Sequence, residues 1–274
     1  MSVIANPIVE TYSRLAREYD EDANFRSCWG RASENAMASI RLRADHNLVL
    51  DVGCGTGRAI RALASIAPPH VQFIGIDPAD NMCRIAAQKT SACPSVQIRR
   101  GSFENIPLET ASVDYLYSIL AFHWVTDLPA AVAEVARVLK PSGEMDLFFI
   151  GRDNGREFIQ KTSFIFLKHM GPALLLDSAR LRKQLTKEAA FQLFSGAFAR
   201  SCLSVEERYT TYYDTLEGHW SWWVRIEGHF VKIPPEKKAA CDREVREALQ
   251  RLAEPQGIPY TIHQLHVEVR RQSP

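Results

Sequence analysis

The sequence lacks long apolar runs and has little net charge. A segment that spans a bilayer needs roughly 20 predominantly apolar residues. The most apolar stretch here, Tyr115–Val125, is shorter and is interrupted by His123. The 33 basic and 32 acidic residues leave a formal net charge of +1, which provides no electrostatic surface for nucleic acid. We therefore predict neither a membrane partner nor a nucleic-acid partner.

The sequence also lacks the closely spaced cysteines that structural metal sites use. Its six cysteines are scattered and include no CxxC pair, whereas structural zinc sites draw on such pairs. The first 25 residues show no basic leader followed by an apolar stretch, which is the pattern of a secretory signal. We therefore predict no bound metal, reduced thiols and a cytoplasmic location.

The sequence does contain a regular alternation of strand-like and helix-like segments between about residues 47 and 150. Short apolar stretches predict strands, and longer segments with apolar residues at helical spacing predict helices. Such alternation is typical of an α/β fold with a parallel sheet and crossover helices. The predicted strands are 48–52, 71–76, 96–100, 113–118 and 144–150, and the predicted helices are 56–67, 80–89 and 128–139.

The first predicted strand runs into a glycine-rich loop, within the stretch "LVLDVGCGTGRAI" from Leu48 to Ile60. Glycine lets the backbone turn tightly and approach a ligand without a Cβ atom in the way. A strand, a glycine loop and a helix in succession therefore indicate a nucleotide-type site, with a tight turn that binds nothing as the alternative. The dinucleotide fingerprint G-x-G-x-x-G/A fits poorly, because Gly57 comes one position early and Arg58 stands where a small residue belongs. An NAD-dependent oxidoreductase is an alternative that this loop disfavours.

A second acid supports a nucleotide site. Asp77 ends the second predicted strand, in "FIGIDPADNM". A carboxylate at this place can accept hydrogen bonds from both hydroxyls of a ribose. The alternative is a turn or helix-capping acid that precedes Pro78.

Together these features resemble class I methyltransferases that depend on S-adenosylmethionine (SAM). The resemblance rests on the D-x-G-x-G-x-G pattern from Asp51 to Gly57, on Asp77, and on the phrasing of residues 101–150. It implies a Rossmann-like three-layer sandwich with a seven-stranded, mostly parallel sheet, an antiparallel last strand and helical lid insertions. It also implies SAM as cofactor and S-adenosylhomocysteine as product. An acid beside the loop suits a cationic sulfonium better than it suits a diphosphate.

The resemblance implies a set of cofactor contacts. The family usually carries an acid near the adenine after the third strand, whereas this chain has Ser102 followed by Phe103, so a hydroxyl, backbone groups and ring stacking would replace the acid. An N-terminal segment folds over the cofactor in this family, where the ring of Tyr19 can contact the sulfonium. The predicted cofactor residues are Tyr19, Asp51, Gly53, Cys54, Gly55, Gly57, Asp77, Pro78, Met82, Ser102, Phe103 and Ser118.

The stretch "FHWV", Phe122–Val125, carries the best local candidate for catalysis. It resembles the trans-aconitate and malonyl-acyl-carrier-protein methyltransferases, which esterify carboxylates. The resemblance implies a methyltransferase that acts on a carboxylate or another oxygen nucleophile of a small or carrier-bound molecule. We predict that His123 acts as a base or orients the substrate; a histidine packed under the lid is the alternative. Methyltransferases with nitrogen, carbon or sulfur acceptors share this phrasing, and a catalytically silent SAM-binding module is a further alternative.

An unusually dense aromatic run follows later, from Tyr209 to Phe230. Apolar walls with a few polar groups are what small-molecule pockets use, so this run predicts part of a substrate cap. A small hydrophobic core beneath a lid is the alternative. The predicted substrate-binding residues are Tyr12, His123, Trp124, Trp223 and Arg225.

These patterns divide the chain into three predicted parts. Residues 1–46 form N-terminal cap helices, and residues 47–150 form the SAM-binding core. Residues 151–274 complete the sheet and supply the lid. The completing strands are predicted at about 204–213 and 262–270, and the helical, aromatic-rich lid at about 152–200 and 214–255.

Overall fold

The computed structural model describes residues 7–270, without the side chains of Ala23, Arg225 and Glu227. Seven strands form one sheet in the order β3-β2-β1-β4-β5-β7-β6. The first five strands run parallel, and β7 runs antiparallel to both of its neighbours. The predicted mostly parallel sheet with an antiparallel last strand is confirmed. The strands are β1 (Leu48–Val52), β2 (Gln72–Asp77), β3 (Val96–Arg100), β4 (Val113–Ile119), β5 (Leu139–Ile150), β6 (Leu203–Asp214) and β7 (Ile258–Val269).

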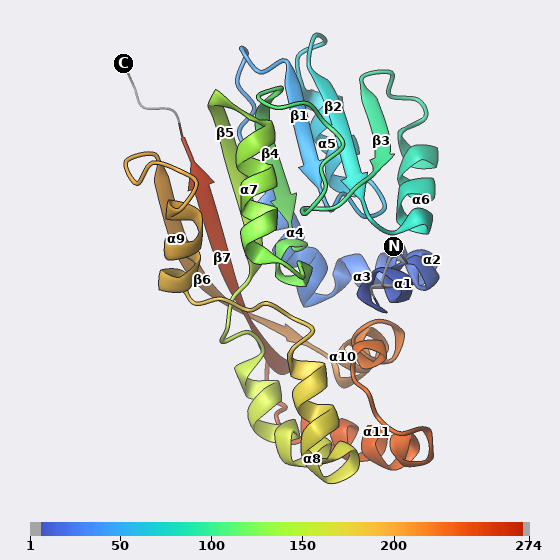
Figure 1. The fold of residues 1–274 in the computed structure, drawn as a ribbon. Coiled ribbons are helices and arrows are strands. Elements are labelled where there is room, and N and C mark those ends of the chain that lie inside the picture. The colour runs from blue at the N-terminus through green and yellow to red at the C-terminus, as the bar shows by residue number, and fades with distance from the viewer. Residues whose placement is uncertain (1–6, 271–274) are drawn as a thin grey trace, which may run out of the picture.

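Helices cover both faces of the sheet and give three layers (Figure 1). On one face, α4 (Cys28–Ser39) and α5 (Arg58–Ile66) pack their apolar side chains on β1, β2 and β4. On the other face, α7 (Leu128–Val138) and α9 (Lys187–Ser195) cover a larger apolar cluster. Strands buried on both faces are nearly continuously apolar, which is why Leu48–Val52 could be recognised as a strand from sequence.

A separate group of helices lies beyond the carboxyl ends of the parallel strands, apart from the three layers (Figure 1). It consists of α8 (Arg156–Ala179), α10 (Leu216–Arg225), the short 3-10 helix η2 (Glu227–Phe230) and α11 (Pro235–Gln250), and we call these elements the cap. The cap has its own apolar core around Phe166, Trp223 and Val245. Helix α8 is kinked at Gly171, which has φ 75°, because Pro172 follows and has no N–H to donate.

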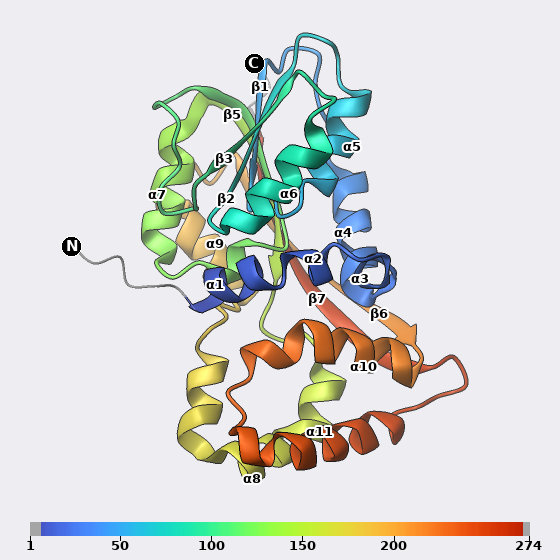
Figure 2. The same cartoon turned by 90° about the vertical axis from the view of Figure 1, so that its right-hand side faces the viewer.

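The N-terminal helices lie between the sheet and the cap (Figure 2). They are α1 (Pro7–Arg14), α2 (Ala16–Tyr19) and α3 (Asp22–Arg26). They contact α6 (Asp80–Thr90) on the sheet side and the cap on the other, so they close the space between the two layers. Within residues 7–270, no helix combines the length and the apolar character that a membrane span requires.

Two strands start earlier than the sequence predicted. Strand β7 begins at Ile258 instead of 262, and β5 begins at Leu139 instead of 144. The early part of β5 is irregular, because Val113 pairs with Leu139 while Tyr115 pairs with Glu144. The intervening "KPSG" residues therefore bulge out of the ladder, which hides the first strand residue from a sequence pattern.

Candidate cofactor and acceptor site

The order of the strands decides where a ligand can bind. The chain fills the sheet outward from β1 to β2 and β3, and then returns to place β4 on the other side of β1. The carboxyl ends of β1 and β4 thus flank a switch point, where open α/β sheets leave a crevice for ligands. The glycine loop follows β1, and the 3-10 helix η1 (Phe122–Trp124) follows β4.

The three glycines of the loop all have left-handed backbone conformations, with φ of 77° at Gly53, 54° at Gly55 and 80° at Gly57. A Cβ atom at Gly53 would lie 2.3 Å from the Cβ atom of Ala121, and one at Gly57 would lie 3.0 Å from Ala86. A Cβ atom at Gly55 would meet no described protein atom within 4 Å. The first and third glycines are thus needed for packing, whereas Gly55 presents bare backbone to open space.

Asp77 connects the loop to the end of β2. Its Oδ2 accepts a hydrogen bond from the Gly55 N–H at 3.0 Å, and its Oδ1 accepts one from the Ala79 N–H at 2.9 Å. Burial raises the pKa of Asp77 to about 6, although these two N–H groups lower it. Asp77 therefore stabilises the turn that precedes α6, as the capping alternative expected, and it also lies against the cavity described next.

A cavity of about 950 Å³ lies over this end of the sheet. Its wall is drawn from α1 and α2, the glycine loop, the ends of β2 and β4, and the segment after β3. The predicted cofactor residues that line it are Tyr19, Gly53, Gly55, Asp77, Pro78, Met82, Ser102 and Phe103. The structure thus brings together residues that are far apart in the chain.

A smaller cavity of about 100 Å³ adjoins the first, since Tyr19, Gly53 and Gly55 line both. Asp51 and Cys54, two further predicted residues, face this smaller space. Gly57 and Ser118 line neither cavity. Gly57 is the residue before α5, and Ser118 is fully buried with its hydroxyl donating to the Val52 carbonyl at 2.6 Å.

Asp51 and Trp29, which line the smaller cavity, each carry a buried polar group. The Asp51 carboxylate lies beside the Tyr117 hydroxyl, whereas Trp29 Nε1 has no hydrogen-bond partner among the described residues. Buried polar atoms without a partner are costly, so this pair is suited to a ligand that brings a cation and an anion. Burial raises the pKa of Asp51 to about 7; a hydrogen bond with the Tyr117 hydroxyl lowers this pKa, and the nearby negative charge of Asp77 raises it further.

These residues fit SAM. The carboxylate of Asp77 could hold the ribose hydroxyls, and the open backbone at Gly55 lets a ligand approach closely. We propose that Asp51 would face the ammonium of the methionine end and that the Trp29 indole N–H would face its carboxylate. Sequence reasoning did not identify Trp29, because a single tryptophan on an N-terminal helix carries no motif.

We propose that adenine binds beside an apolar part of the cavity wall at Phe103. Phe103 lines the cavity, is 5% exposed, and packs edge-on against Phe122 at 5.1 Å between ring centroids. The Ser102 N–H is already bonded to the Asn105 carbonyl at 3.2 Å. We propose that ring contact from Phe103 and a hydrogen bond from the Ser102 hydroxyl replace the acid that the resembled family usually carries near the adenine.

Another part of the large cavity is lined by the aromatic rings of Tyr12 and Trp124. Tyr12 from α1 lies 5.7 Å from Trp124 and 5.8 Å from Tyr19, between ring centroids. Phe230 from the cap lies 4.8 Å from Trp124. Leu120, which precedes η1 and lines the cavity, has a φ of 56°, a conformation that non-glycine residues adopt at a cost and often at functional sites. Tyr12 and Trp124 line the cavity, whereas Phe230 contacts Trp124 without lining it; we call these three rings the aromatic end.

His123 lies outside the lining of this cavity. The side chain is 4% exposed, and its Nδ1 has no hydrogen-bond partner among the described residues. Burial lowers the pKa of His123 to about 3, and the positive charge of Arg182 adds to the effect. The imidazole is therefore neutral near pH 7 and holds a proton only weakly, as expected for a histidine packed beneath a lid.

The aromatic run contributes less to the cavity than predicted. Trp223 is 2% exposed and packs against Phe158 at 5.4 Å and Phe166 at 5.6 Å, within the core of the cap. It lines neither cavity, which matches the alternative of a small hydrophobic core. Arg225 lies at the end of α10, and its side chain is outside the described part of the structure.

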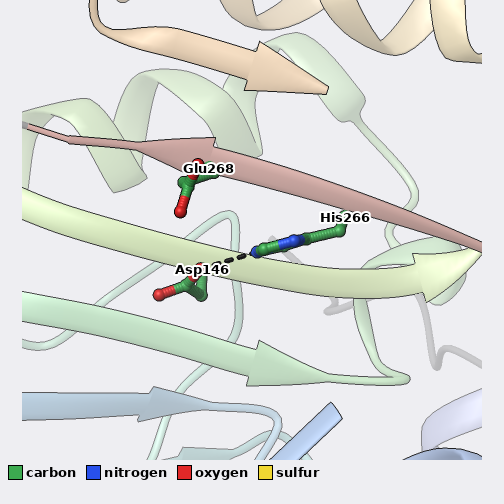
Figure 3. Close-up of side chains that lie close together, drawn as sticks. All are labelled: Asp146, His266 and Glu268. Carbon is green, nitrogen blue, oxygen red and sulfur yellow. Dashed lines mark hydrogen bonds and ion pairs between the residues drawn. The ribbon is translucent and has the colours of Figure 1, made fainter. Parts of the chain in front are cut away.

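A cluster of metal-type ligands lies elsewhere, on β5 and β7 (Figure 3). Asp146, His266 and Glu268 each bring one ligand atom to within 4.8 Å of the others. The guanidinium of Arg270 occupies the same place, 2.7 and 2.8 Å from the two Asp146 oxygens and 2.6 Å from Glu268. Burial raises the pKa of Asp146, but hydrogen bonds from His266 and Arg270 outweigh it and lower the pKa overall. The cluster forms an ion-pair network in which Arg270 lies between the two carboxylates.

The sequence matches known methyltransferases. Residues 50–146 match a family profile described as a methyltransferase domain. An uncharacterized methyltransferase-like protein of Schizosaccharomyces pombe is 29% identical over 73% of this chain and 72% of its own length. A malonyl-[acyl-carrier protein] O-methyltransferase of Yersinia pestis is 33% identical over 52% of this chain, which spans 50% of that protein. A ubiquinone/menaquinone biosynthesis C-methyltransferase of Campylobacter jejuni is 28% identical over 61% of this chain and 73% of its own length.

Solved structures share the fold. The YcgJ protein of Bacillus subtilis superposes with a TM-score of 0.58 at 19% identity, over 89% of this chain and 100% of that one. A phosphoethanolamine N-methyltransferase of Haemonchus contortus, in complex with S-adenosylhomocysteine, superposes with a TM-score of 0.63 at 18% identity. That match covers 99% of this chain and 62% of the other.

Proposed function

We propose that this chain, a SAM-dependent methyltransferase by its domain and its fold, methylates an oxygen nucleophile of a small or carrier-bound molecule, and that this nucleophile is a carboxylate. The observation that carries the proposal is the single cavity of about 950 Å³ that extends from the glycine loop to the aromatic end. It has room for the cofactor and a small acceptor together. The relative named as a malonyl-[acyl-carrier protein] O-methyltransferase supports an oxygen acceptor.

One of the alternative functions is no longer proposed. The glycine loop lies within the part of the chain that matches a methyltransferase domain, which disfavours an NAD-dependent oxidoreductase. A catalytically silent SAM-binding module stays an alternative for the experiment below.

The proposed reaction is an in-line displacement. Bound SAM supplies an electrophilic methyl group on a sulfonium. An acceptor oxygen forms a bond to the methyl carbon while the carbon–sulfur bond breaks. The electron pair of the broken carbon–sulfur bond stays on sulfur. The protein holds the two reactants in line and excludes water. Tyr12 and Trp124 supply the apolar wall beside the acceptor. A carboxylate is already ionised near pH 7, so no residue has to take its proton, which agrees with the buried, neutral state of His123.

One observation favours a second candidate, a carbon or nitrogen acceptor. Among the described residues that line the large cavity, Arg100 is the only cationic side chain, and it is paired with Asp80 at 3.2 Å. A wall of rings without a free cation suits a neutral acceptor. The relative named as a C-methyltransferase and the structural neighbour that methylates nitrogen support this candidate.

Ligand binding to the folded state tests the cofactor assignment. S-adenosylhomocysteine at 100 times its Kd should stabilise the protein by about 2.7 kcal/mol and raise its Tm. NAD at the same concentration should leave Tm unchanged. A rise with NAD alone would remove the basis of the proposal.

Labelled SAM tests the acceptor. The protein is incubated with trans-aconitate and a malonyl thioester as carboxylates, and with a phenol, a primary amine and an enolisable diketone as competing classes. We expect label in the carboxylates, in an ester that mild base hydrolyses. Label in the amine or the diketone alone would establish the second candidate. Tight binding of S-adenosylhomocysteine without transfer to any acceptor would favour the silent module.

A further inference from the structure

The ring of Trp124 is the point where three distant segments meet. Tyr12 from α1 packs edge-on against it at 5.7 Å, and Phe230 from the cap lies at 4.8 Å. The guanidinium carbon of Arg182 lies over the ring, 5.0 Å from its centroid. Arg182 belongs to the segment that connects α8 of the cap to α9 of the core.

This connecting segment is fixed by two backbone hydrogen bonds just after Arg182. The N–H of Lys183 donates to the His123 carbonyl at 2.7 Å. The N–H of Arg152 donates to the Leu185 carbonyl at 2.9 Å. The backbone beside Arg182 is thereby attached to η1, the same short helix that carries Trp124, so the guanidinium has a defined place against the indole.

Arg182 does not line the cavity, whereas Trp124 does. Its effect on a bound acceptor must therefore pass through the indole. A cation over an aromatic face is attracted by the ring quadrupole, which favours one orientation of the ring plane. An indole of fixed orientation presents a wall of fixed shape.

We infer that Arg182 is a positioning residue for the acceptor: by stacking on Trp124 it fixes the aromatic end of the cavity, and so sets acceptor affinity without affecting the cofactor. The kinetic part of this inference rests on the proposed methyl transfer. The structural part does not, because the orientation of the indole can be observed without any substrate.

The structural part is tested with protein labelled with 5-fluorotryptophan. The chain has five tryptophans, and the fluorine resonance lost in Trp124→Phe identifies Trp124. Arg182→Met keeps an apolar stem but removes the charge, and it should shift and broaden this resonance. Arg182→Lys should keep the resonance near its original position. Arg180→Ala, an exposed site two residues earlier, is the matched control and should leave it unchanged. An unaltered Trp124 resonance in Arg182→Met would overturn the inference.

The kinetic part uses whichever acceptor of the panel takes up label. Arg182→Met should raise the acceptor KM about five- to thirtyfold, the range that a cation–π contact of this kind can supply. The kcat should stay within twofold, the Kd of S-adenosylhomocysteine should not change, and Arg182→Lys should recover most of the loss. If the acceptor KM rises and the cofactor affinity falls by the same factor, Arg182 has a general structural role, which would contradict the inference. If no acceptor takes up label, the proposed function fails, while the fluorine spectra still decide the role of Arg182.

Discussion

The two ends of the cavity are built in different ways. The proposed cofactor end consists of backbone and carboxylates, at Gly55, Asp51 and Asp77, which lie within one strand–loop–helix unit and the strand beside it. The aromatic end consists of rings from α1, η1 and the cap, which are separated by more than a hundred residues along the chain. The cofactor end would contact a ligand through bare backbone and charge, whereas the aromatic end would contact it through the shape of its wall.

This difference explains which end a sequence can reveal. Glycine in a left-handed conformation and a carboxylate at the end of a strand are needed wherever a nucleoside binds to this kind of loop. Rings that form a wall can come from any element that the fold brings near. If the comparison is right, changes at the cofactor end should affect cofactor affinity, and changes near the aromatic end should not.

The largest effect is expected from Gly55→Val. The left-handed conformation at Gly55 costs a branched residue about 1–3 kcal/mol, and the new side chain would enter the space that faces the ligand. We expect the affinity for S-adenosylhomocysteine, measured by calorimetry, to fall at least a hundredfold. Gly196→Ala is the control, because its Cβ would meet only the Leu193 carbonyl at an ordinary 3.5 Å. Unchanged affinity in Gly55→Val would move the cofactor away from the loop.

Asp51→Asn should have the next largest effect. The substitution keeps the shape of the side chain but removes the negative charge that faces the smaller cavity. Hydrogen bonds to charged groups contribute about 1.5–3 kcal/mol, so we expect the affinity for S-adenosylhomocysteine at pH 8 to fall about ten- to a hundredfold. The exposed Asp45→Asn is a control that should keep full affinity. Full affinity in Asp51→Asn would mean that the ammonium lies elsewhere.

The pH dependence should separate stability from binding. Burial raises the pKa of Asp51 from 3.8 in a free carboxyl to about 7 in the folded protein. An acid with a raised pKa contributes stability below the unfolded value, and this contribution is lost as the pH rises through the folded value. The ligand-free protein should therefore lose stability relative to Asp51→Asn between about pH 4 and 7. Cofactor affinity should instead increase as the pH rises to about 7, because a protonated Asp51 cannot pair with an ammonium. Thermal unfolding and calorimetry from pH 5 to 8 measure both, and parallel slopes would contradict the assignment.

The smallest effect on catalysis is expected from His123→Phe. The imidazole is buried and lies outside the cavity lining, so its replacement should change kcat less than about threefold, while stability falls by about 1–3 kcal/mol. Initial rates with labelled SAM, together with the Tm, check this. General bases contribute about 10²- to 10⁴-fold, so a hundredfold loss of kcat in a folded variant would restore the role predicted from the "FHWV" stretch.

Much of the fold could be predicted because its signals are local. The apolar run Leu48–Val52 must be buried on both faces, and the helices that follow carry apolar residues at regular spacing. The early start of β5 could not be predicted, because "KPSG" is typical of a turn and the residues before it pair with β4 only through tertiary contacts. Trp29 was likewise missed as a residue that lines the smaller cavity, since nothing in its sequence neighbourhood distinguishes it from core residues.

By itself, the sequence determined the nucleotide-type loop, the two acids beside it and the mostly parallel sheet, because each depends on backbone conformation and burial within a short segment. Only the tertiary structure decided which aromatic residues form the aromatic end. It placed Trp223 in the core of the cap, His123 beneath the surface of the cavity, and Trp124 at the wall with Arg182 over its ring. Trp223 and Trp124 have similar sequence signals, because an apolar ring is buried equally well in a core or against a ligand. Only the packing of distant segments distinguishes a core ring from a wall ring.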